Sequence, residues 1–223
     1  MKEVTVGRRL LSENDRVAEL LRGRFKQQKT LVVNLISSPG SGKTTLLEAT
    51  VSALAGSCRL GAIEGDIATE RDAERLRRVG VPARQIITGG ACHLDARMVE
   101  AELDKGGLEE LDILFIENVG NLVCPTSYDL GEDFKVALLS VTEGADKPFK
   151  YPGIFSRAAV TLITKIDLAP VVDFDLQAVQ DEVRTLNPKA TLLTISAKSG
   201  EGIQPWCRLL MDRLEAKKAS ADN

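Results

Sequence analysis

The chain has 223 residues, of which 43% are hydrophobic and 27% charged, with a formal net charge of -3. This length suits one well-buried α/β domain and leaves little room for a second. The acidic balance argues against a nucleic-acid partner, which would leave a basic footprint. No apolar run reaches the roughly 18 residues needed to cross a bilayer, and residues 1–21 lack the apolar core of a secretory signal. We therefore predict a soluble cytoplasmic protein that binds neither nucleic acid nor membrane.

The N-terminal stretch LLSENDRVAELLRGRFKQ, residues 10–27, has apolar residues at helical spacing. They are Leu10, Leu11, Val17, Leu20, Leu21 and Phe25. We predict an amphipathic lead-in helix within a helical segment over residues 1–29, followed by the main domain over residues 30–223.

Beyond this segment, short aliphatic runs alternate with helix-like segments. The runs span 30–37, 59–66, 84–89, 111–117, 136–141, 159–164 and 191–196, and the helix-like segments span 43–54, 69–79, 95–104, 175–186 and 204–216. Near-continuous apolarity is typical of strands that are covered on both faces. Thr69 with Asp72 predicts a helix start, and Gly80 predicts its end. The pattern predicts an α/β fold with a mostly parallel sheet of about seven strands, flanked by helices on both faces.

The strongest chemical motif, SSPGSGKTT at residues 37–45, follows the first predicted strand. A glycine-rich turn before a helix lets backbone amides converge on a phosphate. We predict that the loop binds nucleotide phosphates through Pro39, Gly40, Ser41, Gly42, Lys43, Thr44 and Thr45. Lys43 reaches the β- and γ-phosphates and Thr44 ligates Mg²⁺ in such loops. Ser37 stands where the usual pattern begins with glycine.

The base of the nucleotide is predicted from two further motifs at strand ends. TKID, residues 164–167, supplies Asp167, whose carboxylate accepts from both donors on the guanine edge, and Lys165, which lies across the base or braces the phosphate loop. TKID resembles the N-K-x-D motif of P-loop GTPases, with Thr164 in place of asparagine. Ser196, Ala197 and Lys198 resemble a further guanine-contacting element of that class. We therefore predict GTP and GDP as the nucleotides.

Two acidic loops are candidates for hydrolysis. ENVGN, residues 117–121, places Glu117 near Mg²⁺ and Gly120 at the γ-phosphate, as GTPases of this class do. Asp66, which ends EGD at 64–66, orients the attacking water or completes the Mg²⁺ shell. We predict catalytic roles for Lys43, Asp66 and Glu117; the alternative for either acid is an ordinary surface carboxylate. No obvious glutamine positions the water, so we expect slow intrinsic turnover.

The lone histidine, His93, lies beside Cys92 after the run 84–89, and Cys124 follows the run 111–117. Parallel strands end at one edge of a sheet, so the three side chains can meet there. Two thiolates and an imidazole suit Ni²⁺, Zn²⁺ or Cu ions. Three ligands leave a site that water, a backbone nitrogen or a second copy can close. The alternative is that the cysteines are small apolar fillers.

TGGACHLD and ENVGNLVCP resemble the metal-site signatures of the GTPases that incorporate nickel into [NiFe]-hydrogenase, and EGDIATERDAERL and DKPFKYP extend the similarity. The resemblance implies a metallochaperone whose Cys92, His93 and Cys124 bind Ni²⁺ or Zn²⁺ and are bridged across a GTP-promoted homodimer. It also implies two kinds of partner, namely other hydrogenase maturation proteins and the hydrogenase large-subunit precursor. By the same resemblance, Lys147 and Lys150 reach a neighbouring subunit or its nucleotide; the alternative is solvated lysines.

Other classes of function remain open on the sequence alone. They are an ATP-dependent small-molecule kinase, a metal-carrying scaffold with a structural nucleotide site, and the urease nickel-loading GTPases. TKID and SAK argue against the kinase, and the order Cys92–His93 fits the urease relatives less well. We assign Cys58, Cys207 and Trp206 to packing.

Overall fold

In this computed structural model, the backbone is described for residues 2–221 and the side chains for residues 11–221. The predictions for residue 1, for residues 222–223 and for the side chain of Leu10 lie outside the described residues. Among the described residues, seven strands form one parallel sheet in the order β3-β2-β4-β1-β5-β6-β7. The strands are β1 Leu31–Ser37, β2 Leu60–Asp66, β3 Ala83–Ile87, β4 Ile113–Glu117, β5 Phe134–Ser140, β6 Val160–Thr164 and β7 Thr191–Ile195. Each corresponds to one predicted run, so the predicted parallel α/β sheet is confirmed.

The helices follow the predicted segments with small differences at their ends. They are α1 Lys2–Gln28, α2 Lys43–Ala53, α3 Arg71–Arg78, α4 Ala96–Leu103, α5 Lys147–Lys150, α6 Pro152–Arg157, α7 Leu176–Leu186 and α8 Ile203–Ala221, with 3-10 turns η1 Cys124–Ser127, η2 Val141–Glu143 and η3 Ile166–Val171. The sequence did not predict α5, α6 or the 3-10 turns. Runs of three to six residues carry too little periodicity to be recognised.

The predicted ends of α3 have different outcomes. Its end at Gly80 is confirmed: the Gly80 amide donates to the Arg77 carbonyl and the Val81 amide to the Leu76 carbonyl, which form a Schellman cap with Gly80 at φ 82°. The predicted start at Thr69 is wrong, because α3 begins at Arg71 without a side-chain cap.

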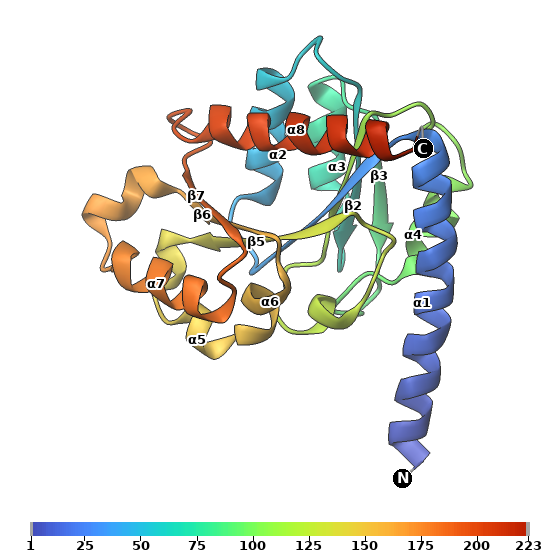
Figure 1. Ribbon diagram of the computed structural model, residues 1–223, viewed down its shortest axis with the longest axis horizontal. Coiled ribbons are helices and arrows are strands. Elements are labelled where there is room, and N and C mark those ends of the chain that lie inside the picture. Colours follow the sequence, from blue (N-terminus) through green and yellow to red (C-terminus); the bar gives the residue numbers. More distant parts are fainter. Residues whose placement is uncertain (1, 222–223) are drawn as a thin grey trace.

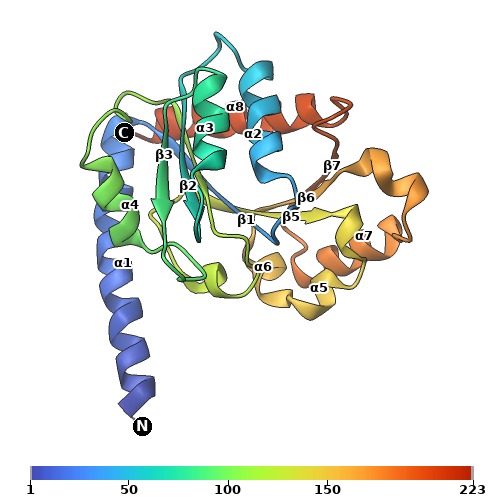
Figure 2. The ribbon, with the colours of Figure 1, turned by 180° about the vertical axis from the view of Figure 1, so that it is seen from behind.

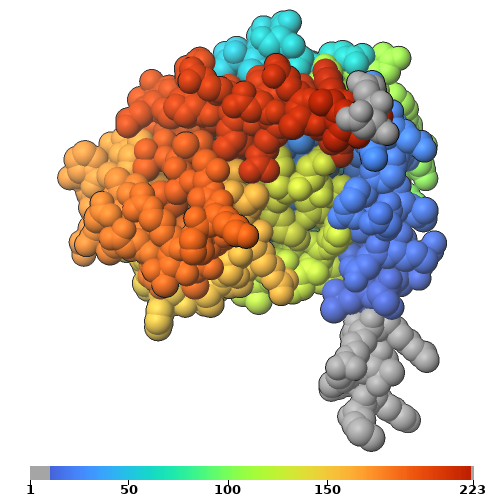
Figure 3. Space-filling view, viewed as in Figure 1, coloured from blue at the N-terminus to red at the C-terminus, as the bar shows by residue number. Residues whose placement is uncertain are grey.

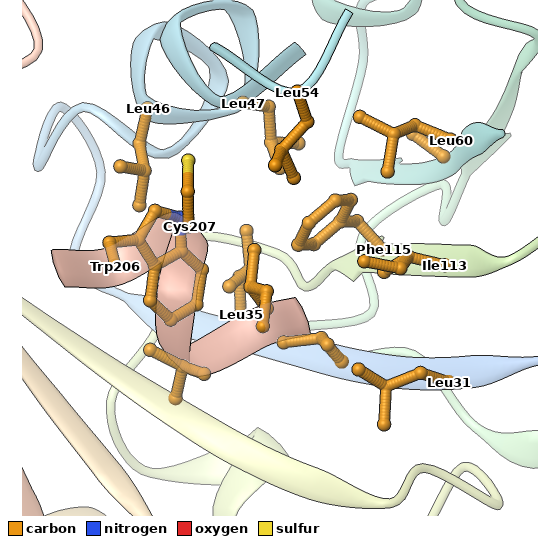
Figure 4. Close-up of a cluster of buried hydrophobic side chains, with 14 of the residues drawn as sticks. Leu31, Leu35, Leu46, Leu47, Leu54, Leu60, Ile113, Phe115, Trp206 and Cys207 are labelled. Atoms are coloured by element: carbon orange, nitrogen blue, oxygen red, sulfur yellow. The ribbon is translucent and has the colours of Figure 1, made fainter. Parts of the chain in front are cut away.

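Helices cover both faces of the sheet (Figures 1 and 2). On one face, α2, α3 and α8 pack over β-strand residues such as Leu35 and Phe115 (Figure 4). Trp206 and Cys207 of α8 are buried in this cluster, and the Trp206 indole donates to the Thr50 hydroxyl at 3.0 Å. Helices α1, α4, α6 and α7 cover the other face. The packing roles of Trp206 and Cys207 thus agree with the prediction.

Helix α1 contributes the buried side chains Val17, Ala18, Leu21 and Phe25 to the core on its face of the sheet. It lies along α4 in both ribbon views, and Figure 3 shows it along one side of the body. The division of the chain after residue 29 stays a prediction. Among the described residues, no helix is both long and apolar enough to span a bilayer.

The carboxyl ends of the strands place the motifs at one edge of the sheet. The phosphate loop follows β1, Asp66 ends β2, Glu117 ends β4, Lys165 follows β6 and Ser196 follows β7. Since all pairings are parallel, these ends face the same way. Open parallel sheets bind their ligands at this edge.

Candidate nucleotide and metal sites

The phosphate loop connects β1 to α2, and its backbone and its lysine are suited to binding an anion. Gly42 precedes α2 with φ 94°, a left-handed conformation that favours glycine and lets the chain turn sharply into the helix. The buried Lys43 ammonium donates to the Ser37 hydroxyl at 2.9 Å. The serine that departs from the usual motif therefore holds the lysine that the motif needs.

Thr44 and Glu117 meet at the first turn of α2. The Thr44 hydroxyl donates to the Glu117 carboxylate at 3.2 Å, and the Lys43 ammonium lies 3.7 Å from the same carboxylate. Burial raises the pKa of Glu117, and the nearby Lys43 opposes that rise. A hydroxyl and a carboxylate are oxygen ligands of the kind that Mg²⁺ prefers, so these residues fit the ion.

Glu64, which the sequence analysis did not single out, lies beside this pair. It stands opposite Glu117 in the parallel register of β2 and β4, and it is almost fully buried. Among the described residues, neither of its carboxylate oxygens has a hydrogen-bond partner. Burial and the neighbouring Glu117 raise the pKa of Glu64 well above its ordinary value. A charged residue inside an apolar strand was the available sequence signal.

Asp66 lines the same hollow as Lys43 and Gly120 but contacts neither Thr44 nor Glu117 through a hydrogen bond. Its carboxylate accepts from the amides of Ala68 and Thr69 at 2.8 and 2.7 Å. Partial burial raises the pKa of Asp66, but the two amide bonds, the Thr69 hydroxyl and Lys43 together hold that pKa below its ordinary value. The turn occupies Thr69, which explains why that residue does not start α3.

The loop after β4 passes directly over the phosphate loop. A Cβ at Gly120 would lie 2.9 Å from the ring of Pro39 and from its backbone nitrogen, closer than such atoms approach. Glycine is therefore required for this contact. The Gly120 backbone lines the phosphate hollow together with Gly40, Gly42 and Thr45.

The motifs after β6 and β7 line a separate apolar pocket beside the phosphate loop. Asp167, Ser196, Ala197 and Lys198 line it, together with Thr45 and Leu46 of α2. The Ser196 hydroxyl donates to the Asp167 carboxylate at 2.6 Å, which fixes that carboxylate at the pocket wall. The fold thus brings together the residues that the sequence predicts for the base.

Two side chains at the carboxyl end of β6 donate hydrogen bonds to carbonyl groups of the phosphate loop. The Thr164 hydroxyl donates to the Ser41 carbonyl at 2.7 Å, so threonine supplies a bracing bond at the position where the motif has asparagine. The Lys165 ammonium donates to the Gly40 carbonyl at 2.7 Å, which is one of the two arrangements predicted for it. Glu143, which the sequence analysis missed, accepts from the Ser41 hydroxyl at 2.6 Å.

Cys92, His93 and Cys124 come together after β3 and β4. One candidate ligand atom from each lies within 4.8 Å of the others, and all three residues are half-buried. The Cys92 sulfur lies 3.7 Å from His93 Nδ1. The contact with Cys124 raises the pKa of Cys92, and burial adds to this rise. Burial lowers the pKa of His93. The imidazole is therefore held in the neutral form that binds metals.

Other segments support the cluster in ways that spacing did not reveal. The Tyr128 ring lies against the His93 ring with centroids 3.8 Å apart. Asn118, between Glu117 and Val119, accepts from the Leu94 amide at 3.1 Å. Asn118 belongs to the loop of residues 117–121, which we call the switch loop, so this loop bonds directly to the chain beside His93.

The remaining predicted residues, which are Lys147, Lys150 and Cys58, neither line the nucleotide pockets nor belong to the metal cluster. Lys150 pairs with Asp146, and the Lys147 ammonium lies 5.4 Å from the ring centroid of Tyr151. Cys58 is half-buried and packs against the core, in agreement with its predicted role.

A seven-stranded parallel sheet with a phosphate loop after β1 and guanine-type motifs after β6 and β7 defines a nucleotide-binding domain of the P-loop GTPase class. Residues 31–194 match the family model described as CobW/HypB/UreG, nucleotide-binding domain. The chain belongs to this family.

Known relatives place the chain near the HypB branch. It is 51% identical over 201 residues to the hydrogenase maturation factor HypB of Escherichia coli (strain K12), a match that covers 90% of this chain and 69% of that protein. The crystal structure of HypB from Helicobacter pylori in complex with nickel is 41% identical, with a TM-score of 0.87 over 92% of this chain and 97% of that chain. HypB from Archaeoglobus fulgidus is 40% identical, with a TM-score of 0.86 over 92% and 100%. The predicted family resemblance is confirmed, and the kinase and urease-loading alternatives are not favoured.

Proposed function

We propose that this protein is a GTP-hydrolysing metallochaperone switch that assists nickel delivery during [NiFe]-hydrogenase maturation. One observation supports it above the others: three candidate metal ligands lie within 4.8 Å of one another, next to the loop that passes over the phosphate site. The similarity to hydrogenase maturation factors, one of them in complex with nickel, supports nickel as the metal and a hydrogenase as the recipient.

For the nucleotide, Lys43 holds the β- and γ-phosphates and Gly120 contacts the γ-phosphate through its amide. Asp167 selects guanine, with Ser196, Ala197 and Lys198 closing the base pocket. Mg²⁺, when bound through Thr44 and Glu117, neutralises charge on the phosphates. Asp66 orients the attacking water from the same hollow. None of the described residues that line this hollow is a glutamine, so intrinsic turnover is low; the reaction also depends on Mg²⁺.

For the metal, Cys92, His93 and Cys124 supply one thiolate-rich half of a site. Three protein ligands fall one short of tetrahedral coordination. A second copy across a two-fold axis completes the site when GTP promotes dimerisation. The ligands suit Ni²⁺ as cargo and Zn²⁺ as a competitor.

The two sites are linked because the switch loop belongs to both. Cys124 lies four residues past Gly120, and Asn118 bonds to the Leu94 amide next to His93. A shift of residues 117–121 when the γ-phosphate leaves therefore moves both metal-bearing segments. Any such linkage is reciprocal, so metal binding changes nucleotide affinity by the same factor.

The cellular setting follows from this role. We propose that the protein acts in the cytoplasm, where it meets other hydrogenase maturation proteins and the hydrogenase large-subunit precursor. We also propose that residues 30–223 form the G domain and residues 1–29 a helical segment that precedes it. Lys147 and Lys150 of α5 contact the second copy or its nucleotide.

The test combines turnover, metal binding and mass in solution. Phosphate release is measured with GTP and with ATP, and Ni²⁺ binding is measured by equilibrium dialysis with GDP and with a non-hydrolysable GTP analogue. We expect hydrolysis of GTP alone, and a dimer with the analogue whose metal content differs from that of the GDP state. Consumption of ATP with transfer of its γ-phosphate to a small acceptor molecule would favour a kinase. A monomer that takes up no Ni²⁺ in either state would remove the metallochaperone role.

A further inference from the structure

A buried side chain of α1 reaches both segments that carry the proposed metal ligands. The side-chain carbonyl of Asn14 accepts from the Ala96 amide at 2.9 Å, and its side-chain amide donates to the Asp129 carbonyl at 2.8 Å. Ala96 lies three residues after His93, and Asp129 lies five residues after Cys124. Asn14 therefore joins the chain after β3 to the chain after β4.

The same helix holds each segment at a second point. Glu13 pairs with Arg97 at 2.7 Å, and Arg22 pairs with the Asp129 carboxylate at 2.7 Å. Both pairs are partly exposed, so water screens them and they contribute little. Asn14 is only 5% exposed. Its two hydrogen bonds form in a low-dielectric setting, where an unmade bond is costly and the geometry is held firmly.

This bridge bears on the spacing of the metal ligands. The Cys92–His93 dipeptide and Cys124 lie in segments that follow different strands, so their separation depends on contacts between the two segments. Tyr128, next to Asp129, lies against the His93 ring, and the hollow beside them is lined by Asn14 as well. A site whose ligands are already in place binds an ion more tightly, because less ordering accompanies binding.

We infer that Asn14 is a positioning residue of the metal site, which by bridging Ala96 and Asp129 holds the Cys92–His93 segment at coordination distance from Cys124. The inference rests on the proposed function, since it needs these three residues to bind a metal. A role of Asn14 in packing alone makes a different prediction, namely a loss of stability without a change in metal affinity.

The test uses the full chain with two substitutions at Asn14 and one matched control. Asn14→Leu removes both hydrogen bonds at similar volume, whereas Asn14→Asp keeps the acceptor for Ala96 and loses the donor for Asp129. Arg24→Ala is the control, since Arg24 also ties α1 to the rest of the protein but bonds to Leu103 and Asp104 at the other end of α4. For each, we measure the Ni²⁺ dissociation constant against a chromophoric chelator, the affinity for a fluorescent GDP analogue, and Tm.

We expect Asn14→Leu to weaken Ni²⁺ binding about tenfold, the scale of losing a supporting hydrogen bond around a metal ligand. Asn14→Asp also weakens it, because its carboxylate has no proton to donate to the Asp129 carbonyl, and both variants leave the GDP affinity of metal-free protein unchanged. If Asn14→Leu does not fold, Asn14→Asp decides. Wild-type Ni²⁺ affinity in folded Asn14 variants, or an equal loss in Arg24→Ala, would overturn the inference while leaving the proposed function intact. Wild-type protein that hydrolyses GTP but binds no Ni²⁺ would instead overturn the proposed metal site, and this inference with it.

Discussion

The nucleotide pocket and the metal cluster lie at the same edge of the sheet, yet the fold holds them differently. The phosphate loop is braced from several segments: Thr164 and Lys165 donate to its carbonyls, and Glu143 accepts from Ser41. The metal ligands share a contact of 3.7 Å between Cys92 and His93, and all three remain half-buried.

This difference teaches what each site needs from outside the chain. One chain lines both the base side and the phosphate side of the proposed nucleotide pocket, so one copy supplies the residues proposed to bind the nucleotide. The cluster offers three ligands, and its proposed completion by a second copy ties metal affinity to the state of the nucleotide. The following predictions test whether the two regions can be separated.

The largest effect is expected from Lys43→Ala, which removes the buried ammonium from the phosphate loop. Loss of an electrostatic contact to the reacting phosphate lowers turnover by about 100-fold or more. Phosphate release under saturating GTP measures it, with Ni²⁺ uptake in the GDP state as the control. Wild-type turnover would show that the loop does not carry the chemistry.

The second prediction removes a proposed metal ligand and leaves the nucleotide site intact. Cys92→Ala or Cys124→Ala each removes a proposed ligand and weakens Ni²⁺ binding by more than about 10- to 100-fold, the range for losing merely a supporting contact. Equilibrium dialysis measures the loss, while the GTP affinity of metal-free protein stays constant. Cys58→Ala is the matched control, since Cys58 is also half-buried but packs against the core. Unchanged uptake in the Cys92 and Cys124 variants would remove the metal assignment.

The base pocket is tested with Asp167→Asn. The side-chain amide can place its NH2 donor group where the guanine edge also presents donors, and an unpaired buried group costs roughly 1–3 kcal/mol. GTP binds more weakly, and xanthosine triphosphate gains, because its 2-carbonyl accepts from the new amide. Competition against fluorescent GDP measures both, with ATP as the reference. Unaltered GTP affinity would place the base elsewhere.

Asn118→Ala addresses the linkage between the two regions. The substitution removes the acceptor for the Leu94 amide, so the switch loop loses its direct bond to the segment beside His93. The factor by which one ligand changes the affinity for another typically lies between about 5 and 150. We expect the factor that links nucleotide state to Ni²⁺ affinity to shrink several-fold in this variant. The ratio of Ni²⁺ affinities with GDP and with a GTP analogue measures it. If the variant has the same ratio as the wild type, the linkage runs through Cys124 alone and not through the bond from Leu94 to Asn118.

The smallest effect is a stability change from Glu64→Gln in nucleotide-free protein. The folded state raises the pKa of Glu64 above 4.5, so its ionisation opposes folding as the pH rises beyond that value. The neutral amide escapes this cost and raises Tm near pH 8, by roughly 2–4 °C for each kcal/mol regained. The gain shrinks toward pH 4.5, where Glu64 is increasingly protonated in both states. Melting curves at pH 5 and pH 8 measure it, and an equal gain at both would contradict the assignment.

Much of the fold is present in the sequence. The apolar runs predict every strand, because strands buried on both faces exclude polar residues almost throughout. The phosphate loop, TKID and SAK predict the nucleotide site, since each motif follows a strand and parallel strands end together. Short elements such as α5 and η1 were missed because tertiary contacts decide such segments.

Sequence patterns alone singled out the side chains proposed to carry chemistry: Lys43, Asp167 and the three metal-type ligands stand out by type and spacing. The tertiary structure alone decided how they are held. Glu64 beside Glu117, Asn118 bonded to Leu94 and Asn14 between Ala96 and Asp129 join residues far apart in the chain. These contacts leave no local pattern in the sequence, because a contact between distant residues does not change the spacing of apolar residues around either of them.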